Sequence, residues 1–495
     1  MLIQTALMAL AATAVSAVKP LEVKGNDFYD PDTGNKFQIV GVGYQPGGSA
    51  GYKPDDNKDP LTDADACMRD AALMQILGIN TVRVYNIDPY LDHDKCASIF
   101  NAAGMYLIID VNSPLPGEAI TSFNPWESYF GGYLNRTFAV MEAFANYPNT
   151  LLFFSGNEII NDKPSAKVTP PYIRAVTRDL KNYVKKNFKR QIPVGYSAAD
   201  VRDYTYDTWN YCQCTIDGEE DNMSRGDVYG LNSYSWCGID ATYTSSSYNE
   251  LTDNFKSSSV PVFFSEYGCN QPLGEPRYWN ESVALYGDKM NGVFSGGLVY
   301  EYSEEDKNYG LVNLTSDGAK LLGDYNRLKN KLTKVDWKSV MAQKAPQKDI
   351  EPPKCDEKLI THDGFLANWT LPAPPDNTKD MIENGVTPKR NGKLVDISDF
   401  KVSLKVSDER GNEMKDLKVV AFSNDEVNYP GKVSTDTGKE TNSSSNSTTG
   451  GDNSTEGDSK GDGKGDGKDD KGNGAASAAP MILAAALPAL AMVFA

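Results

Sequence analysis

Histidine is scarce in this sequence: only His93 and His362 occur among 495 residues. A Ser-His-Asp hydrolase or a histidine-rich zinc site would have to be built on one of these two residues. Neither lies in a suggestive context, and His93, in YLDHDKC, is expected to be solvated near a helix start. Any catalysis should therefore depend mostly on carboxylates, and the sequence implies no metal ion and no organic cofactor.

Positive charge is also in deficit. Lys and Arg together number 49 against 67 acidic residues, and the net charge is −18. Because binding to phosphates requires a basic face, nucleic acid is excluded as a partner. We interpret the negative charge as a contribution to solubility.

Long apolar runs are confined to the two ends of the chain. Residues 1–17 lack the usual positive charges but end on small residues, which predicts a secretory signal peptide rather than a buried helix. Residues 475–495 form an apolar tail after small residues, with no charge behind it, which predicts a removed GPI-attachment signal rather than a tail-anchored helix. Asn473 is the expected attachment residue, with Gly474 and Ser477 as alternatives. The mature protein is expected on the outer face of the plasma membrane, with the cell wall as a second location.

Cysteines and glycosylation sequons agree with export. The seven cysteines predict three disulfides and one unpaired thiol in an oxidising compartment. The sequons lie at Asn135, Asn222, Asn280, Asn313, Asn368, Asn442, Asn446 and Asn453.

From residue 37 to residue 330, apolar runs of strand length alternate with helix-compatible stretches. The runs are FQIVGVGY, NTVRVY, MYLIIDV, LLFFSGNE, QIPVGYS, DVYGLNSY, VPVFFSEYG and GGLVYEYS. Strands separated by helices indicate a parallel α/β sheet, and eight of them can close a (β/α)8 TIM barrel. We therefore predict a catalytic barrel over residues 18–330, with a doubly wound open sheet as the alternative.

The chain beyond the barrel changes character twice. Residues 331–431 contain alternating stretches such as FKVSLKVSDE and predict a small β-rich subdomain packed on the barrel. Residues 432–474 are rich in Ser, Thr, Asn, Gly, Asp and Lys, and predict a disordered stalk. The stretch DGKGDGKDD lacks the spacing and the closing Glu of an EF-hand, so no calcium site is expected.

Two of the most apolar runs end on glutamates. LLFFSGNE ends on Asn157 and Glu158, and VPVFFSEYG carries Glu266. In a barrel, the carboxyl ends of the strands form the active site. A single acidic residue there is usually an ion pair or a cap, whereas two in a polar and aromatic ring indicate chemistry. The other residues at strand ends are Gln45, Tyr85, Asp110, Tyr234, Tyr300 and Tyr302.

A pair of carboxyl groups is what cleavage of a glycosidic bond with retention requires. One acid protonates the leaving oxygen, and the second, as a carboxylate, attacks the anomeric carbon. These roles need different pKa values, which different surroundings must supply. Asn157 is suited to hold a sugar 2-hydroxyl, and tyrosines offer flat faces for pyranose rings.

The motifs resemble a known family. GVGYQPGG, TVRVYNID, GNEIIND, NSYSWCG, FFSEYGCN and SGGLVYEYSEE are similar to the fungal GPI-anchored β-1,3-glucanosyltransferases of the Gas/Gel/Phr family, from about residue 20 to 330 and loosely to 370. The resemblance implies that Glu158 is the acid/base and Glu266 the nucleophile. It places on the glucan Tyr85, Asn157, Asp200, Arg202 and Tyr300, and along the cleft Gln45, Asp110 and Tyr234. Tyr302 is the alternative to Tyr300.

The activity that the resemblance implies is transglycosylation. A β-1,3-glucan is cleaved internally, and its new reducing end is transferred to the non-reducing end of another β-1,3-glucan, which elongates wall glucan. The expected partners are the donor and acceptor glucans and, through the anchor, the plasma membrane. The alternatives are an endo-β-1,3-glucanase and a non-catalytic wall-glucan-binding protein. Some family members carry a further cysteine-rich binding module, which is absent because no cysteine follows Cys355.

A barrel also constrains the disulfides. Cys237 and Cys269 follow neighbouring strands, and Cys67 and Cys96 fall on consecutive helices, so each pair can bridge. Cys355 is then left to pair with Cys212 or Cys214, of which Cys214 is preferred.

Overall fold

The structure, a computed structural model, describes residues 18–345, 350–423 and 425–433. The predicted stalk, the signal peptide, the GPI signal and Asn473 lie outside these residues. No helix within the described ranges is long and apolar enough to cross a membrane.

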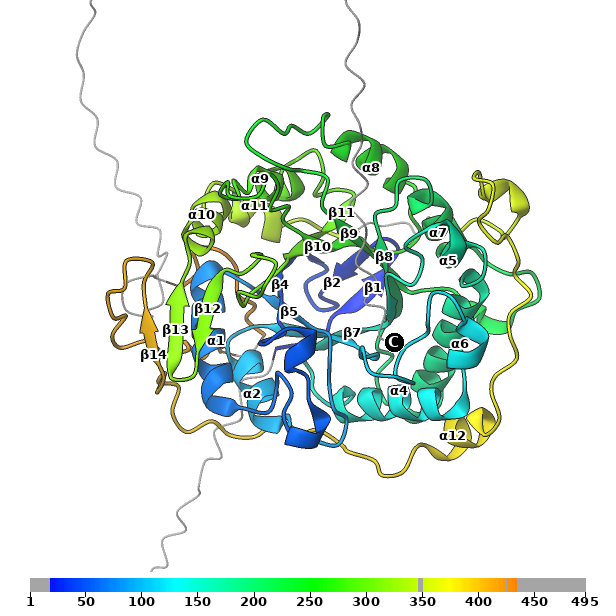
Figure 1. The fold of residues 1–495 in the computed structure, drawn as a ribbon, viewed down its shortest axis with the longest axis horizontal. Helices are drawn as coiled ribbons and strands as arrows, with labels where there is room; N and C mark the ends of the chain where they lie inside the picture. The colour runs from blue at the N-terminus through cyan, green and yellow to red at the C-terminus, as the bar shows by residue number, and fades with distance from the viewer. Residues whose placement is uncertain (1–17, 346–349, 424, 434–495) are drawn as a thin grey trace, which may run out of the picture. The chain divides into compact units, whose positions relative to one another are not determined.

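Eight parallel strands form a closed ring, which confirms the (β/α)8 TIM barrel and excludes the open sheet (Figure 1). The last strand pairs with the first, so the ring has no free edge. In order, the strands are β4 (Ile39–Gly43), β5 (Thr81–Val84), β6 (Tyr106–Asp110), β7 (Thr150–Asn157), β8 (Val194–Ala199), β9 (Val228–Ser233), β10 (Val262–Tyr267) and β11 (Phe294–Val299).

Helices surround the ring and bury its outer face (Figure 1). A strand covered on both faces needs apolar side chains in both directions, which is why runs such as Leu151–Phe154 are apolar throughout. The covering helices are α1 (Ala64–Leu77), α2 (Asp94–Ala102), α4 (Gly131–Phe144), α6 (Pro170–Asn187), α7 (Thr205–Gln213), α8 (Tyr248–Phe255) and α9 (Asn280–Tyr286). Shorter helices lie in the loops: η1 (Ser49–Gly51), η2 (Pro54–Asp56), α3 (Pro125–Ser128), α5 (Lys163–Ala166) and η3 (Glu220–Asn222).

Helix α1 shows how the sequence sets the ends of these helices. The Asp63 carboxylate accepts hydrogen bonds from the backbone N–H groups of Asp65 and Ala66, which caps the first turn. Gly78 ends the helix in a left-handed conformation, with φ of 84°. A Cβ at Gly78 would lie 2.1 Å from Pro430, so glycine is also needed there for close packing.

A small sheet of β1 (Glu22–Lys24), β2 (Asp27–Tyr29) and β3 (Lys36–Phe37) precedes the barrel. Its Phe28 and Phe37 share a buried cluster with barrel side chains that include Ile39, Ile108 and Leu152. Because the inside of an eight-stranded barrel is filled by side chains, this cluster extends the inner core.

The region after the barrel only partly matches the predicted β-rich subdomain. A small sheet does lie beside the barrel, built from β12 (Val312–Thr315), β13 (Gly318–Leu321) and β14 (Lys405–Ser407). Within residues 331–431, however, β14 is the single strand that the described structure contains. The other elements there are the end of α10 (Gly323–Leu332), α11 (Trp337–Met341), η4 (Glu357–Leu359) and α12 (Thr378–Asn384).

The chain from 350 to 433 instead runs outside the helix ring as an extended segment, which we call the belt (Figure 1, yellow to orange). Along its length, the belt contacts the helices in the reverse of their chain order. The backbone N–H of Thr361 donates to Asp207 of α7, and the carbonyl oxygen of Ile382 accepts from the Asn187 side chain of α6. Farther along, the backbone N–H of Lys393 donates to Asp94 of α2. The alternating stretches pair only briefly: β14 lies beside β13, and residues 400–402 hydrogen-bond with residues 417–419.

The belt ends against α1. The backbone of Val420 exchanges two hydrogen bonds with the Gln75 amide. Asn428 donates to the carbonyl oxygens of Gln75 and Ile79.

The structure forms the disulfides Cys67–Cys96, Cys214–Cys355 and Cys237–Cys269, and leaves Cys212 as a buried free thiol. The choice between Cys212 and Cys214 is thereby settled in favour of Cys214. The Cys214–Cys355 bridge ties the start of the belt to the end of α7.

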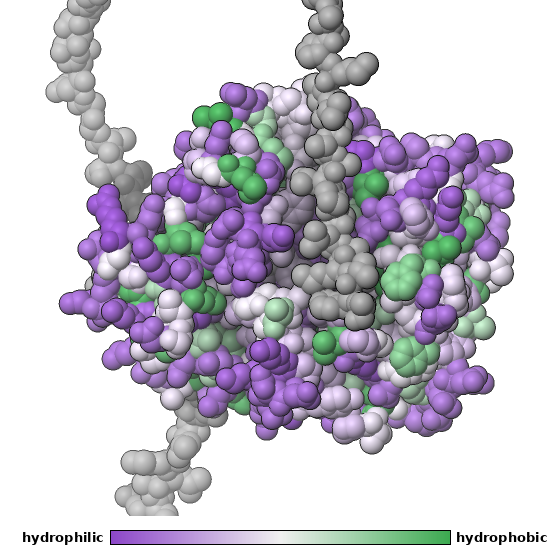
Figure 2. All heavy atoms as spheres, viewed as in Figure 1, coloured by the Kyte–Doolittle hydropathy of each residue, from purple (hydrophilic) through white to green (hydrophobic). Residues whose placement is uncertain are grey.

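The prediction that His93 is solvated is wrong. Its ring is 1% exposed, lies 2.7 Å from the Asp59 carboxylate and stacks on Phe144. Only its position beside the start of α2 was foreseen. The surface seen in Figure 2 is mostly hydrophilic, with hydrophobic residues in scattered groups.

Candidate active site

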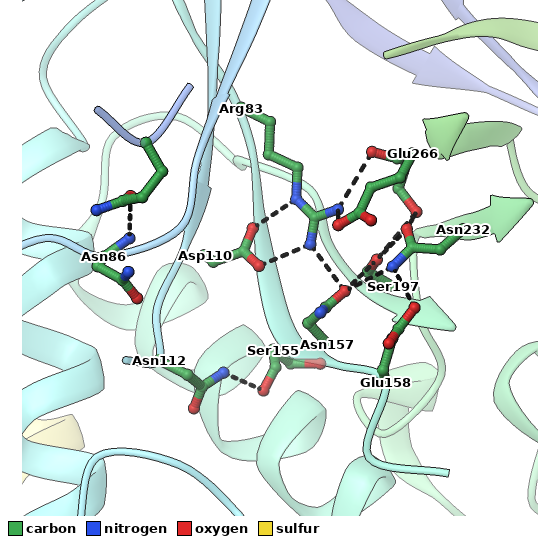
Figure 3. Close-up of polar contacts among 12 residues, drawn as sticks. Arg83, Asn86, Asp110, Asn112, Ser155, Asn157, Glu158, Ser197, Asn232 and Glu266 are labelled. Atoms are coloured by element: carbon green, nitrogen blue, oxygen red, sulfur yellow. Dashed lines mark hydrogen bonds and ion pairs between the residues drawn. The ribbon is translucent and has the colours of Figure 1, made fainter. Parts of the chain in front are cut away.

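The strand ends bring Glu158 and Glu266 into one polar network (Figure 3). Asn157 is the last residue of β7, and Glu158 follows it with φ of 50°. The left-handed region is costly for a residue with a Cβ, and strain of this kind clusters at functional sites. The Glu158 N–H donates to the Ser197 carbonyl of β8 at 2.9 Å, which holds this turn in place.

Glu266 of β10 is buried between two donors. The Tyr234 hydroxyl donates to Oε2 at 2.6 Å, and Nη1 of Arg83 lies 3.3 Å from Oε1. The pKa of Glu266 is raised to about 7, mainly by burial and in part by the charge of Glu158. Arg83 and the Tyr234 hydrogen bond oppose this rise because they stabilise the carboxylate.

Arg83 is the centre of the site, and the sequence reasoning missed it. Its side chain is fully buried on β5, where it forms a two-pronged ion pair with Asp110 at 3.0 and 2.7 Å. Its remaining donors reach the Asn157 Oδ1 at 2.9 Å and the Ser265 carbonyl at 3.2 Å. One signal was available: a single charged residue in the middle of the apolar run NTVRVY needs a buried partner.

Asp110, which the resemblance places along the cleft, lies at the end of β6 against Arg83. Both of its carboxylate oxygens are occupied by Arg83, and the residue is buried. Burial raises the pKa of Asp110, and Arg83 counteracts this rise. Its position therefore makes Asp110 the residue that holds Arg83.

Aromatic rings form one wall around the glutamates. Tyr300 lies edge-on to Tyr85 and Tyr234, each with ring centroids 6.3 Å apart, and to Tyr309 at 5.4 Å. Tyr309 was not predicted, because it lies beyond the eighth strand in a loop that carries no strand signal. The alternative residue, Tyr302, is excluded: it is buried, and its hydroxyl donates to Asp70 behind the barrel wall.

Gln45 lies at the end of β4, buried beside the end of β5. Its Oε1 accepts a hydrogen bond from the Asn86 backbone N–H at 3.1 Å. A backbone N–H can only donate, so the carbonyl end of the Gln45 amide faces Asn86. Tyr85 is adjacent, and Gly43 must be glycine because a Cβ there would lie 2.7 Å from the Tyr85 hydroxyl.

Asp200 and Arg202 form a separate group after β8. Their side chains pair at 3.0 Å. Asp200 also accepts from Ser233 of β9, and Arg202 donates to Ser235. None of the hydrogen bonds of this group reaches Glu158 or Glu266, so it lies beside the two glutamates rather than among them.

Metal chemistry has no evident place among the described residues. In that part of the chain, no group of three or more His, Cys, Asp and Glu side chains is placed to hold a metal ion. The arrangement consists of two carboxyl groups with different surroundings, an amide, and an aromatic wall. Such a site is suited to acid/base and nucleophilic chemistry on a sugar.

Comparisons with known proteins agree with this geometry. Residues 10–336 match the family described as glucanosyltransferase. The chain is 50% identical to the 1,3-beta-glucanosyltransferase gel2 of Aspergillus fumigatus, over 87% of this chain and 89% of that protein. It is 42% identical to the probable 1,3-beta-glucanosyltransferase GAS3 of Saccharomyces cerevisiae, over 84% of this chain and 85% of that protein.

Solved structures give the same result. A mutant of Saccharomyces cerevisiae Gas2p in complex with laminaritetraose and laminaripentaose superposes with a TM-score of 0.63 at 36% identity, covering 73% of this chain and 76% of that one. Gas2p with laminaritriose and laminaritetraose also has a TM-score of 0.63 and 36% identity, covering 73% and 78%.

Proposed function

We propose a mechanism for this chain, which belongs to the glucanosyltransferase family and is a 1,3-β-glucanosyltransferase of the cell wall. It cleaves a β-1,3-glucan internally with retention. The new reducing end then passes to the non-reducing end of a second β-1,3-glucan. The observation that carries the mechanism is the pair Glu158 and Glu266 at the ends of β7 and β10, joined through Arg83, Asn157 and Asn232.

In the first step, Glu158 gives its proton to the leaving glycosidic oxygen while Glu266 attacks the anomeric carbon. The carbon–oxygen bond of the glycoside breaks, and a bond from Glu266 to the sugar forms with inversion. Glu266 suits the role of nucleophile because Tyr234 and Arg83 hold its carboxylate from two sides. Glu158 suits the acid/base role because it is half-buried and can reach the exchanging sugar chains.

In the second step, the acceptor hydroxyl attacks the anomeric carbon. Glu158, now ionised, takes the hydroxyl proton, and Glu266 leaves as a carboxylate. The second inversion restores the original configuration. The Asn157 amide, at the mouth of the site, is placed to donate to the sugar 2-hydroxyl, and the tyrosine wall flanks the rings.

The raised pKa of Glu266 is compatible with its role as the nucleophile. Part of the rise comes from the negative charge of Glu158. When Glu158 carries the proton that it must donate, this repulsion disappears and Glu266 ionises more readily.

A test of the reaction is incubation with a reduced laminari-oligosaccharide of one length. Products longer than the substrate are expected, and products that are all shorter would instead assign the chain as an endo-β-1,3-glucanase. Glu158→Gln and Glu266→Gln should each reduce transfer by several orders of magnitude with unchanged thermal unfolding, because the amide can neither donate the acid proton nor attack. Wild-type transfer by either variant would refute the assigned roles and leave a non-catalytic binding protein as the better description.

We also propose that the protein is secreted and held at the outer face of the plasma membrane by a GPI anchor at Asn473. The support is the pair of terminal apolar segments and the sequons. Phosphatidylinositol-specific phospholipase C should release the full-length protein from membranes into the aqueous phase. Retention of the enzyme-treated protein in the membrane would refute the anchor.

A further inference from the structure

Asn232 connects the two halves of the catalytic site, although it was not among the predicted site residues. It lies on β9, is 2% exposed, and is the register partner of Glu266 on β10. Its Nδ2 donates to Oε1 of Glu158 at 2.8 Å and to Oδ1 of Asn157 at 3.1 Å. One buried amide therefore contacts both the proton-transfer group and the proposed sugar-binding group (Figure 3).

Arg83 determines the direction of these hydrogen bonds. A guanidinium can only donate, so the Asn157 atom 2.9 Å from it must be the carbonyl oxygen. The Asn232 atom that meets this oxygen must then be its NH2 group, which also faces the acceptor on Glu158. The other end of the Asn232 amide is therefore its oxygen.

Two serines satisfy that oxygen. The Ser265 hydroxyl donates to Asn232 Oδ1 at 2.7 Å, and the Ser197 hydroxyl lies 3.2 Å from the same atom. Ser197 also donates to Asn157 Oδ1 at 2.8 Å. The buried serines could also accept hydrogen bonds, but a flipped Asn232 amide would place its oxygen against Oε1 of Glu158 and Oδ1 of Asn157, and both of these atoms are acceptors. A buried polar group without a partner costs about 1–3 kcal/mol, so the flipped state is disfavoured.

We propose that Asn232 is a positioning residue that orients Glu158 for proton transfer and the NH2 group of Asn157 toward the sugar. This inference rests on the role of Glu158 in the proposed function. The Asn157 oxygen accepts from Arg83, Ser197 and Asn232, which leaves the amide NH2 for a ligand. Glu158 sits on a half-buried turn with a left-handed backbone, where a single side-chain donor has a large effect on its orientation.

The test compares two substrates that differ in their need for an acid. A laminari-oligosaccharide needs its leaving oxygen protonated, whereas a dinitrophenyl laminari-oligoside leaves without a proton. Asn232→Ala should reduce kcat/KM, which reports the first step, by about tenfold to a hundredfold on the oligosaccharide, and the loss on the dinitrophenyl substrate should be at least about fivefold smaller.

Asn149→Ala is the matched control. Asn149 is also fully buried and donates to two carbonyl oxygens, but it lies at the opposite end of the barrel, just before β7. It should lower the unfolding temperature without changing the ratio of rates on the two substrates. Equal losses on both substrates for Asn232→Ala would mean a structural role and overturn the proposal.

Two further variants separate the possible failures. Glu158→Gln must itself lose more activity on the oligosaccharide than on the dinitrophenyl substrate. Equal losses on the two substrates would refute the proposed function. If Glu158→Gln shows this difference and Asn232→Ala does not, only the role of Asn232 fails. If Asn232→Ala does not fold, Ser265→Ala can replace it. This variant removes the donor to the Asn232 amide oxygen and keeps both Nδ2 contacts. We expect it to show a smaller difference in activity loss between the two substrates. Wild-type behaviour of a folded Ser265→Ala would then count against the inference.

Discussion

Replacing Arg83 with methionine should separate stability from catalysis at this site. Methionine retains an apolar stem between the rings of Tyr85 and Phe154, which lie 4.5 and 4.8 Å from the guanidinium carbon. It removes the charge that pairs with Asp110 and Glu266. Leaving a buried ion without its partner costs about 3–5 kcal/mol, so we expect a loss of this size in the free energy of unfolding.

The loss should depend on pH in a defined direction. Without Arg83, the pKa of Asp110 and of Glu266 in the folded protein rises further above the unfolded value. Folding then takes up protons, so stability that is present below the unfolded pKa is lost as the pH rises. Arg83→Met should therefore be destabilised more at pH 8 than at pH 5, as measured by urea unfolding followed through tryptophan fluorescence.

A second substitution distinguishes this account from general loss of packing. Asp110→Asn, added to Arg83→Met, removes one of the two buried negative charges that have lost their partner, while keeping the shape of the side chain. The double variant should recover at least about 1 kcal/mol at pH 8. Transfer activity should remain lost, because Glu266 and Asn157 still lack their cationic partner. An Arg83→Met protein within 1 kcal/mol of wild type at pH 8, or a double variant less stable than the single one, would refute the reasoning.

Three other perturbations test separate parts of the structure. Tyr234→Phe removes a hydrogen-bond donor that lowers the pKa of Glu266. The acidic limb of the kcat/KM profile should therefore shift to higher pH, by about one unit or less. An unchanged acidic limb would contradict the assignment of Glu266 as the nucleophile. Burial raises the pKa of Glu281 from 4.5 to about 7. At about 1.4 kcal/mol per unit, about 3 kcal/mol of stability is therefore present below pH 4.5 and lost as the pH rises through 7. Glu281→Gln should remove this part of the pH dependence in urea unfolding, and an identical slope would disprove it. Replacing both Cys214 and Cys355 with serine opens a link across 141 residues, so unfolding should become easier by up to about 5 kcal/mol, and a change below 1 kcal/mol would contradict this estimate.

The barrel was predictable because its strands are apolar on both faces. Each of the eight apolar runs overlaps one barrel strand, and the glutamates on two of these runs lie at the strand ends, as expected for a barrel. Helix ends were harder to place: α9 ends at Tyr286, where Gly287 takes an extended backbone conformation. Helix ends of this kind depend on local backbone geometry more than on composition.

The centre of the site was harder to predict. Arg83 and Asn232 can be recognised as site residues only after the barrel has closed, because closure brings together residues that lie far apart in the sequence. Asn232 looks like any polar residue in DVYGLNSY until β9 pairs with β10 and sets it opposite Glu266. Conversely, Asp110 has the right residue type at the right strand end, but Arg83 occupies both of its oxygens.

The alternating stretches of the belt predicted more strand than the structure contains: β14 pairs with β13 and residues 400–402 with 417–419, while most of the belt forms no strand. An extended chain that lies across helices also buries every second side chain, as a half-exposed strand does. Alternation reports one-sided burial, and it does not say whether a strand or a helix provides the surface.

The belt also determines where this chain can be shortened. A protein ending at residue 341 would retain all eight barrel strands and both glutamates. Its helices would, however, lose contact with four buried belt residues: Phe365, Val386, Val419 and Phe422. Such a fragment should be prone to aggregation, although no catalytic group is missing. We therefore expect a stable fragment to include the belt, whose buried residues extend to Val433.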